Sequence, residues 1–205
     1  MENKKTELII IIDKSGSMFS LQEDVIGGYN AFIEEQKKLG PASVTIVAFN
    51  HLVDIIAEDV DIEKVSPLNK RNYSPCGCTA LLDAVGDTIS LIKAKHAKLK
   101  EEELPEHTIF SIVTDGLENS SREYSYAKVK NMIEMQTKAG WDFIFQAANI
   151  DVAKEGDRLG INPSMRASFC ANSKGVERQT RFLCEKVTSL RKGNSHGKGG
   201  KSLNK

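Results

Sequence analysis

The feature that most constrains the fold is a run of five branched aliphatic residues at positions 8–12, which ends abruptly at Asp13. A run this short and this apolar predicts a strand buried on both faces, as in the centre of a parallel sheet. Five further strand-like segments follow, and most are separated by stretches with helical spacing of apolar residues. The predicted fold class is therefore α/β: a Rossmann-like, doubly wound, mostly parallel six-stranded sheet with helices on both faces.

The expected elements can be placed by residue number. Asn50 and His51 alone separate the second and third strands, so this pair should form a hairpin with one antiparallel strand at the sheet edge. Strands are expected at residues 6–12, 43–49, 52–58, 108–114, 143–147 and 167–170, and helices at 21–39, 79–99, 123–139, 152–159 and 176–190.

The 205 residues are enough for one domain with a large core, expected over residues 1–190. The 28 basic residues balance the 28 acidic ones, so net charge indicates neither nucleic acid nor a membrane. No segment approaches the ~20 apolar residues that cross a bilayer, and the run before Asp13 is too short for a secretory signal. Four cysteines are too few for a secreted disulfide framework. A cytoplasmic location is expected.

The end of the chain differs in composition from the rest. Residues 191–205 contain five basic side chains and no acidic one, among many Gly, Ser and Asn residues. This composition predicts a disordered basic tail. Such a tail could contact nucleic acid or an acidic partner, although most basic tails are simply solvated ends.

Chemistry is concentrated where the first strand ends. Asp13, Ser15 and Ser17 place one carboxylate and two hydroxyls on alternate residues, and Gly16 allows the backbone to turn. Side chains at such spacing can converge on one point. Converging hard oxygens suit Mg²⁺ or Mn²⁺ rather than zinc or copper.

Two more candidates are expected at the same edge of the sheet. Asp115 follows the strand at 108–114, and ligands of doubly wound sheets bind beyond the carboxyl ends of strands, where the strand order reverses. Thr79 opens the long helix after a loop that contains Cys76 and Cys78. Asp13 and Asp115 should therefore meet at one crevice, with Thr79 on its rim.

Each of these parts also has a simpler interpretation. The Asp13–Ser17 segment could be a turn that caps the following helix. Thr79 could be an N-cap, and Asp115-Gly116 could be an ordinary turn. Asp83, one turn into the helix, could support the site or could only complement the helix dipole.

Asp13-x-Ser15-x-Ser17, Thr79 in Thr-Ala-Leu-Leu, and Thr114-Asp115-Gly116 occur in this order along the chain. The combination resembles the metal-ion-dependent adhesion site of the von Willebrand factor A domain family. The resemblance covers roughly residues 6–190. Residues 140–145 and 148–151 further resemble the small stand-alone bacterial and phage members of that family.

The resemblance implies a role for each residue. Ser15 and Ser17 would bind the cation directly, and Thr79 would bind it directly or through water. Asp13 and Asp115 would act mainly through water or by orienting the hydroxyls. A Glu or Asp carboxylate supplied by a protein partner would complete the coordination, so the resemblance implies a protein-interaction module rather than an enzyme. The lack of a spanning segment predicts no membrane partner, and the balanced charge disfavours nucleic acid.

Two alternatives stand beside this interpretation. A Mg²⁺-dependent phosphohydrolase can also begin with an apolar strand and an aspartate, but that chemistry needs a second aspartate two residues later, where Ser15 stands. Neither Ser15 nor Ser17 has an evident histidine base for acyl transfer. A nucleic-acid-associated protein acting through the basic tail is the other alternative. A metal-binding or redox role for Cys76 and Cys78 also remains open at this point.

Overall fold

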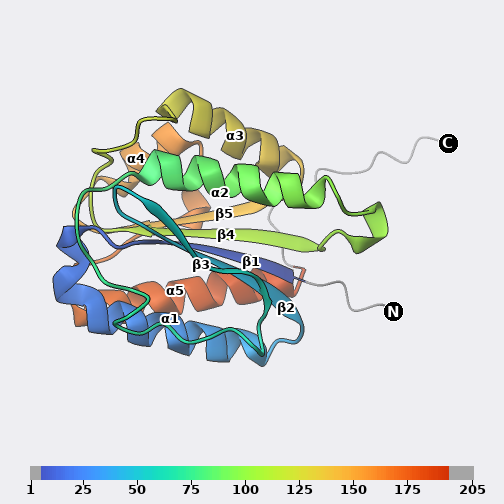
Figure 1. The fold of residues 1–205 in the computed structure, drawn as a ribbon, viewed down its shortest axis with the longest axis horizontal. Coiled ribbons are helices and arrows are strands. Elements are labelled where there is room, and N and C mark those ends of the chain that lie inside the picture. The colour runs from blue at the N-terminus through green and yellow to red at the C-terminus, as the bar shows by residue number, and fades with distance from the viewer. Residues whose placement is uncertain (1–5, 194–205) are drawn as a thin grey trace.

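The structure is a computed structural model that describes residues 6–193. A central sheet lies between two layers of helices (Figure 1). The strands are β1 (Thr6–Asp13), β2 (Ala42–Phe49), β3 (Val53–Asp61), β4 (His107–Thr114), β5 (Asp142–Ala147) and β6 (Arg166–Ser168). The helices are α1 (Gln22–Lys37), α2 (Leu81–His96), α3 (Tyr126–Lys138), α4 (Val152–Leu159) and α5 (Ser173–Arg191), with short 3₁₀ turns η1 (Gly16–Leu21), η2 (Glu101–Glu103) and η3 (Pro163–Met165).

The sheet has six strands in the order β3-β2-β1-β4-β5-β6. β1 pairs in parallel with both β2 and β4, and β5 and β6 continue the parallel arrangement. β3 pairs antiparallel with β2 at one edge. The hairpin turn is residues 50–52, one residue longer than predicted, because β3 begins at Val53 rather than Leu52. The predicted fold class, including its single antiparallel edge strand, is confirmed.

The apolar run that begins the chain forms the centre of the core. Every residue of β1 is buried, because helices cover both faces of the sheet. Leu8, Ile10 and Ile12 pack with α1 and α5, whereas Ile9 and Ile11 pack with α2 and α3. Figure 1 shows these two pairs of helices on opposite sides of the sheet. The alternation of side chains along a strand thus divides one apolar run between two cores.

The ends of several elements differ from the predicted ones. The expected helix at 79–99 begins only at Leu81, so Thr79 lies in the preceding loop. The turn η1, which was not predicted, separates Ser15 from α1. α5 extends to Arg191, whose guanidinium donates hydrogen bonds of 2.7 Å to the carbonyl oxygens of Gln36 and Gly40 and so ties α5 to the end of α1.

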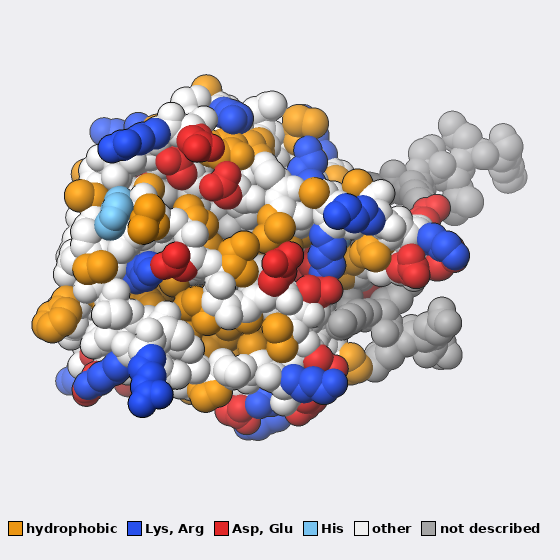
Figure 2. Space-filling view, viewed as in Figure 1, with side chains coloured by type: hydrophobic (Ala, Val, Ile, Leu, Met, Phe, Trp, Pro, Cys, Tyr) orange, Lys and Arg blue, Asp and Glu red, His pale blue; other side chains and the backbone are white. Residues whose placement is uncertain are grey.

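The surface carries both signs of charge. Figure 2 shows basic, acidic and hydrophobic side chains interspersed over the visible face, without a large field of one sign. Within residues 6–193, no helix is both long and apolar enough to cross a membrane. Residues 194–205, most of the predicted basic tail, lie outside the described residues.

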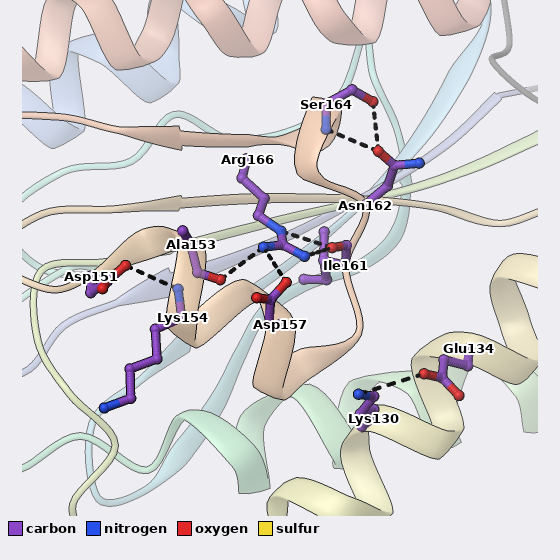
Figure 3. Close-up of polar contacts among 10 residues, drawn as sticks. All are labelled: Lys130, Glu134, Asp151, Ala153, Lys154, Asp157, Ile161, Asn162, Ser164 and Arg166. Atoms are coloured by element: carbon purple, nitrogen blue, oxygen red, sulfur yellow. Dashed lines mark hydrogen bonds and ion pairs between the residues drawn. The ribbon is translucent and has the colours of Figure 1, made fainter.

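A buried guanidinium holds the last strand in place. The Arg166 side chain is 8% exposed and pairs with Asp157 at 2.8 Å. It also donates hydrogen bonds to the carbonyl oxygens of Ile161 (2.7 Å) and Ala153 (2.8 Å), as Figure 3 shows. A Cβ at Gly156 would lie 2.4 Å from Cδ of Arg166, so glycine leaves the room that this side chain needs. Arg166 therefore fastens α4 and the loop after it to β6.

We expect the Arg166→Met substitution to lower the free energy of unfolding by about 1–3 kcal/mol, because the carbonyl oxygen of the buried residue Ile161 would lose its donor. Chemical denaturation followed by circular dichroism measures this. Arg181→Met is the matched control, since the Arg181 side chain is 68% exposed and its loss should change stability by less than about 0.5 kcal/mol. Equal stability of the two variants would contradict the assignment.

Candidate metal centre

The candidate site lies at the carboxyl ends of β1 and β4, which are neighbours at the centre of the sheet. The chain leaves β1 toward α1 on one face and leaves β4 toward α3 on the other (Figure 1). This is the position where the strand order reverses and where ligands of doubly wound sheets bind. The predicted switch point therefore lies between β1 and β4.

The Asp13 carboxylate is fully buried and is held from two sides. One oxygen accepts a hydrogen bond from the backbone N–H of Ser15 (2.6 Å), and the other accepts one from the hydroxyl of Thr114, the last residue of β4 (2.6 Å). The Tyr73 hydroxyl donates to the Asp13 carbonyl oxygen at 2.7 Å. These contacts fix the turn that presents the two serines.

The two serine hydroxyls converge with the second carboxylate. Ser15 Oγ and Ser17 Oγ lie 3.1 Å apart, and Ser17 Oγ donates a hydrogen bond of 2.5 Å to Asp115 Oδ1, although 98 residues separate the two. Ser15 stands at the N-cap position of η1, but its side chain makes no capping hydrogen bond. The capping interpretation therefore does not account for these hydroxyls, which are free to serve the crevice.

Thr79 completes the group. It is not the N-cap of α2; Ala80 takes that position. A Cβ added at Gly116 would lie 3.7 Å from Thr79 Oγ1 and 3.9 Å from Ser17 Oγ, so the two hydroxyls border the same small space beside Gly116. The structure thus brings together all five side chains that the sequence analysis selected: Asp13, Ser15, Ser17, Thr79 and Asp115. Ser17 is exposed while the other four are buried, so the site opens to solvent.

Backbone hydrogen bonds align the loop before Thr79 with the serine turn. Gly16 N–H donates to the Gly77 carbonyl (3.0 Å), and Cys76 N–H donates to the Lys14 carbonyl (2.8 Å). Gly77 has a φ of +77°, a conformation that glycine adopts without strain. On the other side, the Asn50 amide donates to the Cys76 carbonyl at 2.9 Å. The loop before Thr79 is thereby held by two separate segments, the serine turn and Asn50.

Two residues that were not predicted from the sequence connect the loop after β4 to this region: Asn119 holds Thr79, and Glu118 holds the start of α2. The Asn119 side chain accepts a hydrogen bond from the Thr79 N–H (2.9 Å), and the Asn119 N–H donates to the Thr79 carbonyl (3.0 Å). The Glu118 carboxylate accepts from the Leu82 N–H at 2.9 Å, at the start of α2, and from the Ser121 hydroxyl at 2.7 Å. The only signal in the sequence was a carboxylate and an amide shortly after Asp115.

Two other candidates from the sequence have different surroundings. Asp83 accepts hydrogen bonds from the N–H groups of Arg122, Glu123 and Tyr124 at 2.8–3.0 Å, so it orders the loop before α3. Cys76 and Cys78 are exposed free thiols. Within residues 6–193, no group of three or more His, Cys, Asp or Glu side chains is arranged to hold a metal ion. A cation at the crevice would therefore depend on hydroxyl oxygens.

Burial raises the pKa of both carboxyls above their usual range. For Asp13, hydrogen bonds from Thr114 and Ser15 oppose the effect of burial in part, and for Asp115 the bond from Ser17 does so. The nearby Lys14 ammonium is paired with Asp54. Burying carboxylates is costly without a compensating positive charge, and a divalent cation between Asp13 and Asp115 would provide one.

The spacing of the hydroxyl oxygens fits the Mg²⁺ ion that the sequence predicts. Mg²⁺ binds oxygen octahedrally at about 2.0–2.1 Å, which places neighbouring ligand atoms about 3 Å apart. Ser15 Oγ and Ser17 Oγ have this separation, at 3.1 Å. Asp115 Oδ1 is closer to Ser17 Oγ, at 2.5 Å, which suits a charge-assisted hydrogen bond to a hydroxyl.

No protein-family model matches this sequence, and no curated protein matches it. Solved structures do match. The PilB minor pilin from Streptococcus sanguinis has a TM-score of 0.65 at 13% identity, covering 96% of this chain and 64% of the pilin. Proximal thread matrix protein 1 from the mussel byssus, with a zinc-occupied metal-ion-dependent adhesion site (MIDAS) motif, has a TM-score of 0.61 at 15% identity. The match covers 90% of this chain and 46% of the byssus protein. The vWF domain of the type V pili tip protein Mfa5 from Porphyromonas gingivalis has a TM-score of 0.63 at 9% identity. The match covers 96% of this chain and 98% of that domain.

These likenesses, at identities of 9–15%, show the fold alone. The chain has the von Willebrand factor A fold, as the resemblance in the sequence predicted. It spans less than two thirds of the pilin (64%) and of the byssus protein (46%). The activities of those longer proteins are therefore not carried over to it.

We expect the Asn119→Ala substitution to weaken Mg²⁺ binding about tenfold, because groups that orient metal ligands typically have effects of this size. Isothermal titration calorimetry measures the affinity, and thermal unfolding verifies that the variant folds. Asn131→Ala, an exposed residue of α3, is the matched control and should bind as the unmodified protein does. An unchanged affinity in Asn119→Ala would show that Thr79 needs no anchoring from this side.

Proposed function

We propose that this chain is a divalent-cation-dependent protein-interaction module that binds a Glu or Asp side chain of a partner protein. One observation carries the proposal: hydroxyls from two distant segments, Ser15 and Ser17 on one and Thr79 on the other, border one crevice that two buried acids, Asp13 and Asp115, also face. All the donors are hard oxygens, which favours Mg²⁺ or Mn²⁺.

The hydroxyls and the carboxylates have different tasks in this proposal. Ser15, Ser17 and Thr79 hold the cation, while Asp13 and Asp115 orient these groups. Asp13 does so through the Ser15 N–H, and Asp115 through the Ser17 hydroxyl. Because the direct ligands are neutral, the bound cation supplies a positive charge that can accept a carboxylate from outside. The exposure of Ser17 leaves an approach for that group.

The structural neighbours support this direction without establishing it. The byssus protein was solved with zinc in its MIDAS motif, and the other two structures are a minor pilin and a pilus tip domain. A fold found in such proteins is compatible with a role in protein interaction. The choice between Mg²⁺ and Mn²⁺, and the acidic partner, rest on the chemistry of this chain's own residues.

We also propose that the site breaks no bond. The position that a phosphohydrolase would need for its second aspartate is taken by Ser15. The Ser15 and Ser17 hydroxyls hydrogen-bond to each other, and the Ser17 hydroxyl also to Asp115; within residues 6–193, neither is hydrogen-bonded to a histidine base. Nucleic-acid binding through the basic tail would depend almost wholly on residues outside the described part of the chain.

Calorimetric titration of Mg²⁺ and Mn²⁺ tests the cation site. The unmodified protein should bind one ion saturably, and the Ser15→Ala, Ser17→Ala double variant should lose about 100-fold or more in affinity, because it lacks two direct ligands. Neither serine side chain caps a helix, so the variant should keep its fold.

The matched control is the Ser164→Ala, Ser173→Ala variant, which removes two hydroxyls at exposed positions. It should bind like the unmodified protein. If the double variant at the site and this control bind the ions equally, the two serine hydroxyls are not ligands and the proposed function fails.

A further inference from the structure

Large exposed hydrophobic side chains are unevenly distributed over the molecule. Within the described residues, five are prominent: Phe19 (70% exposed), Leu52 (59%), Leu117 (57%), Met135 (52%) and Ile55 (48%). Three of them lie on segments that carry or support the candidate metal centre: Phe19 in η1, Leu117 after β4, and Leu52 in the hairpin of Asn50. Phe19 comes two residues after Ser17, and Leu117 two residues after Asp115. Single exposed apolar residues need no explanation, but a group around a functional site indicates an interaction surface.

The two residues nearest the crevice are held facing outward. In η1, Met18 and Leu21 are buried in the core, and the turn leaves Phe19 in solvent. Leu117 stands between Gly116, which borders the space between the site hydroxyls, and Glu118, whose carboxylate is fixed by backbone N–H groups. Both side chains are therefore exposed on segments whose neighbouring residues are fixed by burial or hydrogen bonds.

Leu52 comes from a third segment that is joined to the same site. Its N–H donates to the Asn50 side chain (2.8 Å), and its carbonyl accepts from the Asn50 N–H (2.9 Å), so the hairpin tip is fixed. Asn50 in turn accepts from the Ala80 N–H through its carbonyl at 2.7 Å, next to Thr79. Figure 2 shows hydrophobic side chains and a histidine at the end of the molecule where the site loops lie.

We propose that Phe19, Leu52 and Leu117 form an apolar rim that docks a protein segment in which the acidic residue is flanked by large apolar side chains. This inference rests on the proposed function and specifies its partner. The acidic residue of the partner is the group that the positive charge of the proposed cation would attract. The buried carboxylates of Asp13 and Asp115 would repel an acid unless the cation is present, so contacts with the rim and with the cation are made together. Apolar neighbours of the acid would then bury the rim.

The test is a selection of random twelve-residue peptides displayed on phage against the full chain in Mg²⁺. The enriched peptides should carry Asp or Glu with large apolar residues within a few positions, and EDTA should release them. Phe19→Ser and Leu117→Ser should each weaken a selected synthetic peptide about tenfold, because each removes a side chain of the size that dominates apolar burial. Their Mg²⁺ affinity should stay unchanged.

Ile55→Ser and Met135→Ser are matched controls, because they remove exposed hydrophobic residues outside the rim. They should bind the peptide as the unmodified protein does. The rim proposal is overturned if no peptide is enriched, if the enriched acids lack apolar neighbours, or if the rim and control variants bind alike.

Two further measurements distinguish a protein segment from other occupants of the rim. They also distinguish failure of the rim proposal from failure of the cation site. Phe19-dependent binding to phosphatidylcholine–phosphatidylglycerol vesicles, or Phe19-dependent dimerisation in light scattering, without peptide binding would overturn the proposal in favour of a lipid surface or a second copy. Saturable Mg²⁺ binding together with peptide affinities that Phe19→Ser and Leu117→Ser leave unchanged would refute the rim proposal alone. Absence of Mg²⁺ binding would refute the proposed function, and the rim proposal with it.

Discussion

The hydrogen bond between Thr114 and Asp13 joins the ends of the two central strands, and the site depends on it. β1 and β4 are parallel neighbours, so their last residues emerge side by side in a fully buried place. A carboxylate there must be hydrogen-bonded or compensated in charge. The Thr114 hydroxyl and the Ser15 N–H satisfy Asp13 and at the same time fix the turn that carries the serines. The pairing of β1 with β4 thereby determines where the hydroxyls of Ser15 and Ser17 lie.

The remaining parts of the site are connected to this pair from both sides of the sheet. The β4 loop reaches Ser17 through Asp115, and a few residues later it holds the Thr79 backbone through Asn119. One continuous segment, residues 115–119, therefore contacts the Ser17 hydroxyl at one end and the Thr79 backbone at the other. A displacement of this segment would move the ligands relative to one another. Glu118 of the same segment accepts from the Leu82 N–H and so connects it to the start of α2.

Much of this arrangement could be predicted from the sequence because it depends on short-range patterns. The apolar run ending at Asp13 fixed the central strand, and alternation of strands and helices gave the doubly wound class and the edge where the acids meet. The contacts of Asn119 with Thr79 and of Glu118 with Leu82 could not be predicted, since both side chains accept from backbone N–H groups, which carry no side-chain signature. The same holds for Asp83, which binds the N–H groups of a loop about 40 residues later. Helix starts shifted for a related reason: loop contacts, rather than propensity, decide where α2 begins.

The central claim is that Ser15, Ser17 and Thr79 hold a divalent cation, and anomalous diffraction from crystals grown with Mn²⁺ tests it most directly. Manganese is distinguished from water by its anomalous signal. The account predicts one strong peak within about 2.3 Å of Ser15 Oγ and Ser17 Oγ, at the open side of the crevice. A peak elsewhere, for example beside Asp83 or the Cys76 and Cys78 thiols, with this crevice filled only by water, would contradict the account.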